Sequence, residues 1–184
     1  MKDYNIIASI SDQDFNLPSK ELSNPIIRYA SRGILLDDNN QIAIINKKVK
    51  NEYKLPGGGM EEGENKEEAF LRELYEETGC LAEITDFLGI TIEEKNQTNF
   101  KQISYVFVGR VIKKTSKLHL TKKEKNEKTN VLWTSINEGL KLIKNSEKEL
   151  IGSVYDNLYK SLFMVRRDSR ILEYYCNKTK ELLN

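Results

Sequence analysis

Residues 58–80 read GGMEEGENKEEAFLRELYEETGC, and the fold is decided in this stretch. Past the opening glycines, apolar residues recur with helical spacing among acidic ones, which predicts a helix over residues 65–78. Gly79 supplies the stop at the end of that helix. Just upstream, residues 55–59 (LPGGG) are a breaker cluster, which we expect to end any regular element.

Three carboxylates of the predicted helix share one face, since Glu73 lies three residues before Glu76 and four before Glu77. Like charges at this spacing cost about 0.2–0.5 kcal/mol per pair unless a cation neutralises them. Oxygen ligands of high charge suit Mg²⁺ or Mn²⁺ better than zinc, and Mg²⁺ commonly binds carboxylates together with substrate phosphates. The spacing therefore points to phosphoryl or nucleotidyl chemistry, while the carboxylates alone also fit an acidic solvated helix face.

The whole stretch resembles the box of the Nudix (MutT-like) hydrolase family, G-x5-E-x7-R-E-U-x-E-E-x-G-U, in which U is apolar. Every fixed position is present, and the one relaxed position is the last, where a small apolar thiol replaces the usual aliphatic side chain. The matching residues are Gly58, Glu64, Arg72, Glu73, Leu74, Glu76, Glu77, Gly79 and Cys80.

The resemblance assigns a role to each box residue. It implies that Glu73, Glu76 and Glu77 bind the metal and carry the catalysis, with a backbone carbonyl of Gly57 or Gly58 as a further ligand. It also implies that Arg72 pairs with Glu64 to hold the loop against the helix, and that Gly58 and Gly79 shape the backbone. The implied reaction is attack of a metal-activated water on a diphosphate, with Mg²⁺ or Mn²⁺ as cofactor.

Candidates outside the box are fewer. Glu127, or Glu124 in the same Lys-rich loop, is a candidate extra ligand or general base, with Glu127 preferred; an ordinary surface charge is the alternative. Arg28 and Arg32 are four residues apart on a predicted strand and so on one face. In the family such arginines contact substrate phosphate, although exposed strand charges are the default interpretation. A structural role is expected for His119, the only histidine.

The flanking sequence predicts strands and helices in alternation. Strands are expected near residues 4–10 and over residues 26–36, 41–46, 84–93, 103–112 and 131–133. A Lys-rich loop over residues 113–128, a helix over residues 136–143, and a mostly helical segment over residues 147–183 with a break near residues 166–168 complete the pattern. We therefore expect one Nudix domain over residues 1–184, an α/β/α sandwich with a mixed β-sheet.

Composition narrows the class of protein. The 184 residues are 39% hydrophobic and 31% charged with a net charge of +1, as in a globular protein, and contain no apolar run that could span a bilayer. Two cysteines cannot form a disulfide framework, and no secretory signal is visible, which favours the cytoplasm.

The expected activity is cleavage of a diphosphate linkage in a nucleoside diphosphate-X substrate. A nucleoside triphosphate, including an oxidised one, is preferred by elimination, because motifs of other subfamilies are absent. Two alternatives stay open: a non-catalytic nucleotide-sensing Nudix-fold protein, and an RNA 5′-end pyrophosphohydrolase that uses the lysines of residues 113–128. We expect a small-molecule substrate and no nucleic-acid or membrane partner, and leave a homodimer open.

Overall fold

The computed structural model describes residues 4–115, 117–152 and 157–181. Their strands are β1 (Ile6–Ser11), β2 (Ile26–Leu36), β3 (Ile42–Lys47), β4 (Glu52–Lys54), β5 (Gly57–Gly59), β6 (Cys80–Lys95), β7 (Phe100–Lys114) and β8 (Thr129–Thr134). Their α-helices are α1 (Lys66–Thr78), α2 (Lys122–Asn126), α3 (Ile136–Glu149) and α4 (Leu158–Glu181), and short 3-10 turns η1 (Asp12–Phe15), η2 (Lys48–Lys50) and η3 (Asn96–Thr98) join them.

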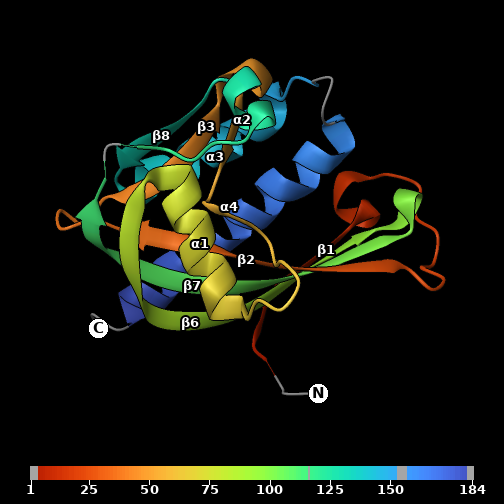
Figure 1. Ribbon diagram of the computed structural model, residues 1–184. Coiled ribbons are helices and arrows are strands. Elements are labelled where there is room, and N and C mark those ends of the chain that lie inside the picture. Colours follow the sequence, from red (N-terminus) through yellow and green to blue (C-terminus); the bar gives the residue numbers. More distant parts are fainter. Residues whose placement is uncertain (1–3, 116, 153–156, 182–184) are drawn as a thin grey trace.

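The described strands form one mixed sheet in the order β1-β6-β7-β2-β3-β4. The β1–β6 and β2–β7 pairs are parallel, and the β6–β7 and β3–β4 pairs are antiparallel. Helix α1 covers one face of the sheet, and α3 and α4 pack together on the other face (Figure 1). The prediction of an α/β/α sandwich with a mixed sheet is confirmed.

Two apolar cores follow from the alternation of side chains along each strand. On β2, Leu35 points to α1 and packs with Phe70 and Leu74 of that helix. Ile34 points to the opposite face and belongs to the core that α3 and α4 complete with Ile143, Val165, Ile171 and Leu172. The strand is therefore buried on both faces, except at its start, where it extends past the helices.

The sheet opens in the middle, and the opening positions the site. Strands β2 and β3 pair at Leu36 and Ile42. Beyond that pair β2 takes β5 as its partner, whereas β3 pairs with β4 and β8. Side chains from both faces of the sheet can therefore meet at one place.

Three local predictions were wrong. The glycines of residues 57–59 form strand β5 instead of ending regular structure, because their backbone pairs with residues 30–32 of β2. Helix α4 continues through residues 166–168 without a break, because Arg167 and Asp168 find ion-pair partners inside the protein. The Lys-rich loop contains the short helix α2, which Thr121 and Glu124 cap reciprocally.

No helix among the described residues is long and apolar enough to cross a membrane. Both cysteines are free, and Cys80 is buried in the core under α1.

Candidate functional site

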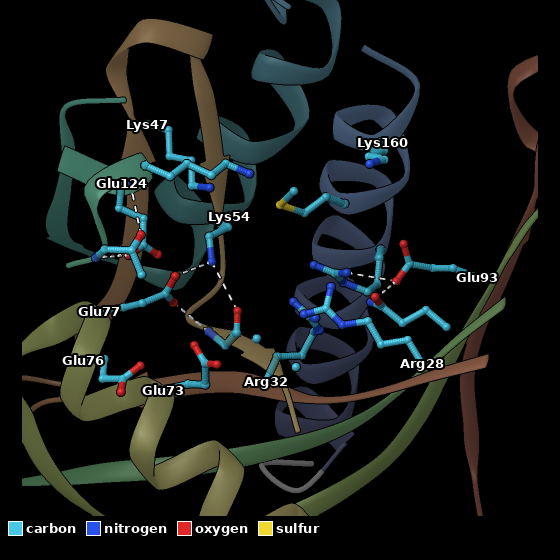
Figure 2. A pocket seen from close by; sticks show the side chains of 18 of the residues that line it. Arg28, Arg32, Lys47, Lys54, Glu73, Glu76, Glu77, Glu93, Glu124 and Lys160 are labelled. Carbon is cyan, nitrogen blue, oxygen red and sulfur yellow. Dashed lines mark hydrogen bonds and ion pairs between the residues drawn. The ribbon is translucent and has the colours of Figure 1, made fainter. Parts of the chain in front are cut away.

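A cavity of about 690 Å³ lies where the sheet opens. On one side is what we call the acidic wall, the α1 carboxylates Glu73, Glu76 and Glu77. Across from it is the basic wall, which comes from β2, β6 and α4 and consists of Arg28, Arg32, Lys95, Lys160 and Arg167. Figure 2 shows the labelled carboxylates of the acidic wall facing Arg28 and Arg32 across the opening.

The acidic wall depends on a helix with well-defined ends. The side chain of Asn65 accepts a hydrogen bond from the Glu68 N–H at 2.9 Å, and the Glu68 carboxylate accepts one from the Asn65 N–H at 3.0 Å. Gly79 ends the helix in the left-handed conformation, at φ 67°. The buried residues Ala69, Phe70 and Leu74 fix the rotation of α1, so that its carboxylate face points to the cavity.

Glu77 is the most buried carboxylate of the acidic wall, with 3% of its surface exposed. Its Oε1 accepts a hydrogen bond from Lys54 Nζ at 2.6 Å, and its Oε2 accepts one from the Gly57 N–H at 2.8 Å. Lys54 Nζ also donates to the Gly57 carbonyl oxygen at 3.3 Å. The ammonium group of Lys54 therefore lies between the Glu77 carboxylate and the Gly57 carbonyl oxygen.

Glu73 lies between the helix and the glycine strand. Its carboxylate is so close to Gly58 that no Cβ could stand at position 58 without displacing it. Burial and the charge of Glu77 raise the pKa of Glu73 above its ordinary value, despite the hydrogen bond that Arg72 donates to its Oε1 at 3.0 Å. The acidic wall therefore has an excess of negative charge that a further cation would neutralise.

Arg72 ties the loop to the helix as the box predicts. Its Nε and Nη2 donate to the two oxygens of Glu64 at 2.8 and 3.0 Å, and Nη2 also donates to the Gly59 carbonyl at 2.9 Å. Its Nη1 reaches Glu76 at 3.3 Å. The hydrogen bonds that Arg72 donates to the Glu64 carboxylate raise the pKa of Arg72. One guanidinium thus holds the loop carbonyl and two of the helix carboxylates in place.

The donor set fits a hard divalent cation, although no metal-ready cluster is assembled. Among the described residues, no three His, Cys, Asp or Glu side chains are grouped to hold one ion. Lys54 and Arg72 instead hold the carboxylates one by one. The fit rests on the position of Lys54 Nζ, which occupies a place between a carboxylate and a carbonyl oxygen that Mg²⁺ would also favour. The residues that could hold the ion are Glu73, Glu76 and Glu77, with the carbonyl of Gly57 or Gly58.

The two downstream glutamates are placed differently from the sequence expectation. Glu127 is buried and forms an ion pair with Lys47 at 3.1 Å, but it does not line the cavity. Glu124 does line it. Burial acts to raise the pKa of Glu124, but the hydrogen bonds that Thr121 donates to it hold that pKa below its ordinary value. Of the two, Glu124 is the carboxylate that a substrate in the cavity could meet (Figure 2).

Both predicted substrate-binding arginines line the cavity from the same face of β2. The glycine strand makes room for them: the stem of Arg32 lies against Gly57, and the guanidinium of Arg28 lies against Gly59. Arg28 is exposed, as the default interpretation expects, but Arg32 is 5% exposed. The absence of a β-carbon at Gly57 and Gly59 leaves room for the two arginines, as its absence at Gly58 leaves room for Glu73.

The rest of the basic wall was missed from the sequence. Arg167 forms an ion pair with its neighbour in the chain, since its Nε donates to Asp168 at 2.8 Å. Its Nη1 also donates to Glu93 of β6 at 2.9 Å, and Glu93 in turn accepts from Lys95 at 2.8 Å. The available signal was a pair of opposite charges on the apolar face of a long helix, which requires buried partners elsewhere.

His119 has the structural role expected of it. Its ring stacks on Tyr75 with 4.8 Å between centroids, and its backbone N–H donates to the Glu76 carbonyl at 2.9 Å. The lysine loop is thereby attached to the end of α1.

Together these features define an α/β protein in which a carboxylate wall and a basic wall face each other across one cavity (Figure 2). The chain belongs to the NUDIX domain family, whose pattern matches residues 27–153. An ADP-ribose pyrophosphatase of Methanocaldococcus jannaschii is 36% identical over 81 residues, which are 42% of this chain and 48% of that protein. A Bacillus subtilis protein named as a candidate 8-oxo-dGTP diphosphatase is 33% identical over 78 residues, 42% of this chain and 50% of that protein.

The chain thus spans about half the length of the curated relatives it matches. Among solved structures, a NUDIX hydrolase from Nitrosomonas europaea has a TM-score of 0.59 with 16% identity, and the match covers 84% of this chain and 90% of that one. At that identity the likeness concerns the fold alone. Helix α4 lies beyond the residues that match the family.

Proposed function

We propose that the protein is a metal-dependent Nudix pyrophosphohydrolase that cleaves a diphosphate linkage in a nucleoside diphosphate-X substrate. The observation that carries the proposal is the arrangement of Glu73, Glu76 and Glu77 beside the glycine strand, in the same cavity as buried and exposed arginines. Anionic phosphates need positive charge around them, and a carboxylate cluster next to them needs a bridging cation. The names of the two relatives describe enzymes of the same chemical class.

Each side chain has a part in the proposed reaction. Glu73, Glu76 and Glu77 would hold Mg²⁺ or Mn²⁺ with a carbonyl of Gly57 or Gly58, and Arg72 and Glu64 fix the backbone that presents the carbonyl. When bound, the ion lowers the pKa of a coordinated water and neutralises phosphate charge. Arg28 and Arg32 orient the phosphates, since guanidinium groups bind them in bidentate fashion. The role first considered for Glu127, as base or extra ligand, moves to Glu124 because that carboxylate lines the cavity.

A nucleoside triphosphate is the preferred substrate in this proposal. The many lysine and arginine side chains that line the cavity support a highly charged ligand, and the name of one relative includes a dGTP derivative.

The test is product release from nucleoside triphosphates, ADP-ribose, nucleotide sugars and dinucleoside polyphosphates, with Mg²⁺ or Mn²⁺. The natural chain is compared with Glu77→Gln and with a matched control, Glu83→Gln, whose exposed carboxylate lies outside the cavity. We expect Glu77→Gln to lose at least about 100-fold in kcat, since loss of an outer-shell partner alone typically costs 10–100-fold. Tight nucleotide binding without cleavage of any substrate would contradict the hydrolase proposal and favour a nucleotide-sensing protein.

A further inference from the structure

Two guanidinium groups are buried together in the basic wall. Arg32 is 5% exposed and Arg167 is 2% exposed, and both line the cavity. Each has one buried nitrogen without a hydrogen-bond partner, Nε of Arg32 and Nη2 of Arg167. Burial and the neighbouring charge of Arg167 lower the pKa of Arg32 to about 10. Buried donors without partners are costly, so such a pair needs an explanation.

The charges around the pair do not balance. Arg167 is paired with Glu93 and Asp168, and Lys95 shares Glu93. The Asp168 carboxylate also accepts a hydrogen bond from the Leu55 N–H at 2.9 Å. Arg32 forms no ion pair with any described residue. Three cations, Arg32, Lys95 and Arg167, therefore face two carboxylates, and the exposed Arg28 and Lys160 add positive charge at the rim.

The rest of the lining gives little else for a ligand to contact. Among the described residues that line the cavity, Phe100 and Met164 are the only large apolar side chains. A pair of aromatic rings that could hold a base between them is therefore missing from this part of the cavity. Recognition here rests on charge, and the fork geometry of arginine matches phosphate oxygens.

We propose that Arg32 and Arg167 form an anion subsite for a phosphate group that the substrate carries in addition to the scissile diphosphate. This inference rests on the proposed function and narrows its substrate class to ligands with at least three phosphates. Arg28, which lies against Gly59 beside the acidic wall, and Lys54 are left for the scissile diphosphate. Arg167 comes from α4, so the subsite is contributed partly by a helix beyond the family match.

The first experiment measures the subsite without catalysis. Thermal unfolding of the natural chain is followed in EDTA, with inorganic phosphate or with NaCl of equal ionic strength. Without a divalent ion the acidic wall repels anions, so a rise of Tm in phosphate reports the basic wall. We expect Arg32→Gln to have a higher Tm than the natural chain in NaCl, because a buried charge repelled by Arg167 is removed. We expect its phosphate affinity to fall by about tenfold or more.

The matched control is Arg166→Gln, the neighbour of Arg167 on α4. Arg166 pairs with Glu147 at 2.5 Å and does not line the cavity. This variant should lose some stability and keep the phosphate-induced shift. An equal shift in the natural chain and Arg32→Gln, or no shift in either, overturns the proposal.

The second experiment compares substrates that differ by one phosphate: ATP with ADP, and ADP-ribose 2′-phosphate with ADP-ribose, in Mg²⁺. In at least one pair the natural chain should prefer the extra phosphate by about tenfold or more in kcat/KM, and Arg32→Gln should reduce that preference. Turnover without a preference in either pair overturns the inference and leaves the hydrolase intact. A phosphate-induced rise in Tm without turnover of any substrate supports the subsite and overturns the proposed hydrolase.

Discussion

The carboxylate of Glu73 fills the space that a β-carbon at Gly58 would need, so α1 and the glycine strand meet where the cation site is proposed. The same strand accommodates Arg32 at Gly57 and Arg28 at Gly59. Three consecutive glycines therefore serve three charged side chains, one of the acidic wall and two of the basic wall.

Gly58→Ala should remove most of the activity. The new Cβ would displace the Glu73 carboxylate, and a misplaced metal ligand weakens both Mg²⁺ binding and kcat. Mg²⁺ titration of activity and of Tm measures both effects. The matched control is Gly152→Ala, whose Cβ would meet an ordinary contact at 3.9 Å. Unchanged Mg²⁺ affinity in Gly58→Ala would argue against Glu73 as a ligand.

Lys54→Met should destabilise the metal-free protein by about 3–5 kcal/mol, since it leaves the buried Glu77 carboxylate without its cation. Because the ammonium group lies where a metal would bind, Mg²⁺ should raise the Tm of the variant more than that of the natural chain. Lys101→Met is the control, because its half-exposed pair with Glu94 contributes at most about 1 kcal/mol. Equal Mg²⁺ shifts in all three proteins would place the ion elsewhere.

Arg72→Lys should weaken Mg²⁺ binding by roughly 10–100-fold, as changes to groups that orient metal ligands do. Lysine cannot reproduce the two-pronged pair with Glu64 together with the bond to the Gly59 carbonyl. The exposed Arg170, which pairs with Glu173 on α4, is the matched site for a neutral Arg→Lys change. Mg²⁺-dependent kcat and KM separate the loss of the cation from a loss of substrate affinity.

Stability should fall in acid through Glu93. Burial acts to raise the pKa of Glu93, but the charges of Arg167 and Lys95 hold that pKa at about 2, below its ordinary value of 4.5. A carboxylate with a depressed pKa in the folded state stabilises the protein above the unfolded pKa. That contribution, on the order of 3 kcal/mol, is therefore lost as the pH falls from about 4.5 towards 2.

The contribution of Glu93 to stability is measured by urea unfolding between pH 6 and pH 3 of the natural chain, Glu93→Gln and Glu94→Gln. Glu93→Gln should be less stable at pH 6 and should depend less on pH, whereas Glu94→Gln should follow the natural chain. A Glu93→Gln variant with the natural pH dependence would assign the acid sensitivity to other groups.

The sequence was most informative where one pattern meets several constraints at once. The box predicted α1 within a residue, and the ion pair that joins Arg72 to Glu64 is present. The layers followed from the interspersed strands and helices, and the continuous buried run at the end of β2 agrees with cover on both faces. Strand β5 could not be foreseen, since a glycine triplet has little intrinsic preference for a strand, and its pairing depends on side chains from β2 and α1.

The basic wall was harder to predict because its charges are matched over long sequence separations. Exposure was the default interpretation of Arg32, but the side chain is 5% exposed and lines the cavity together with Arg167 of α4. Arg167 finds Glu93 across 74 residues, a partner that no local pattern indicates. The choice between Glu124 and Glu127 likewise depended on how the short helix α2 turns.

The contribution of α4 has a consequence for synthesis of the protein. The ribosome releases the chain from its N-terminus, so Glu77 emerges roughly 90 residues before Arg167. At typical elongation rates this delay is roughly 5–20 s. During that interval the nascent chain has its carboxylate helix but not the guanidinium that completes the opposite wall, and the Leu55 N–H waits for Asp168. The cavity can therefore be completed only after α4 has been synthesised.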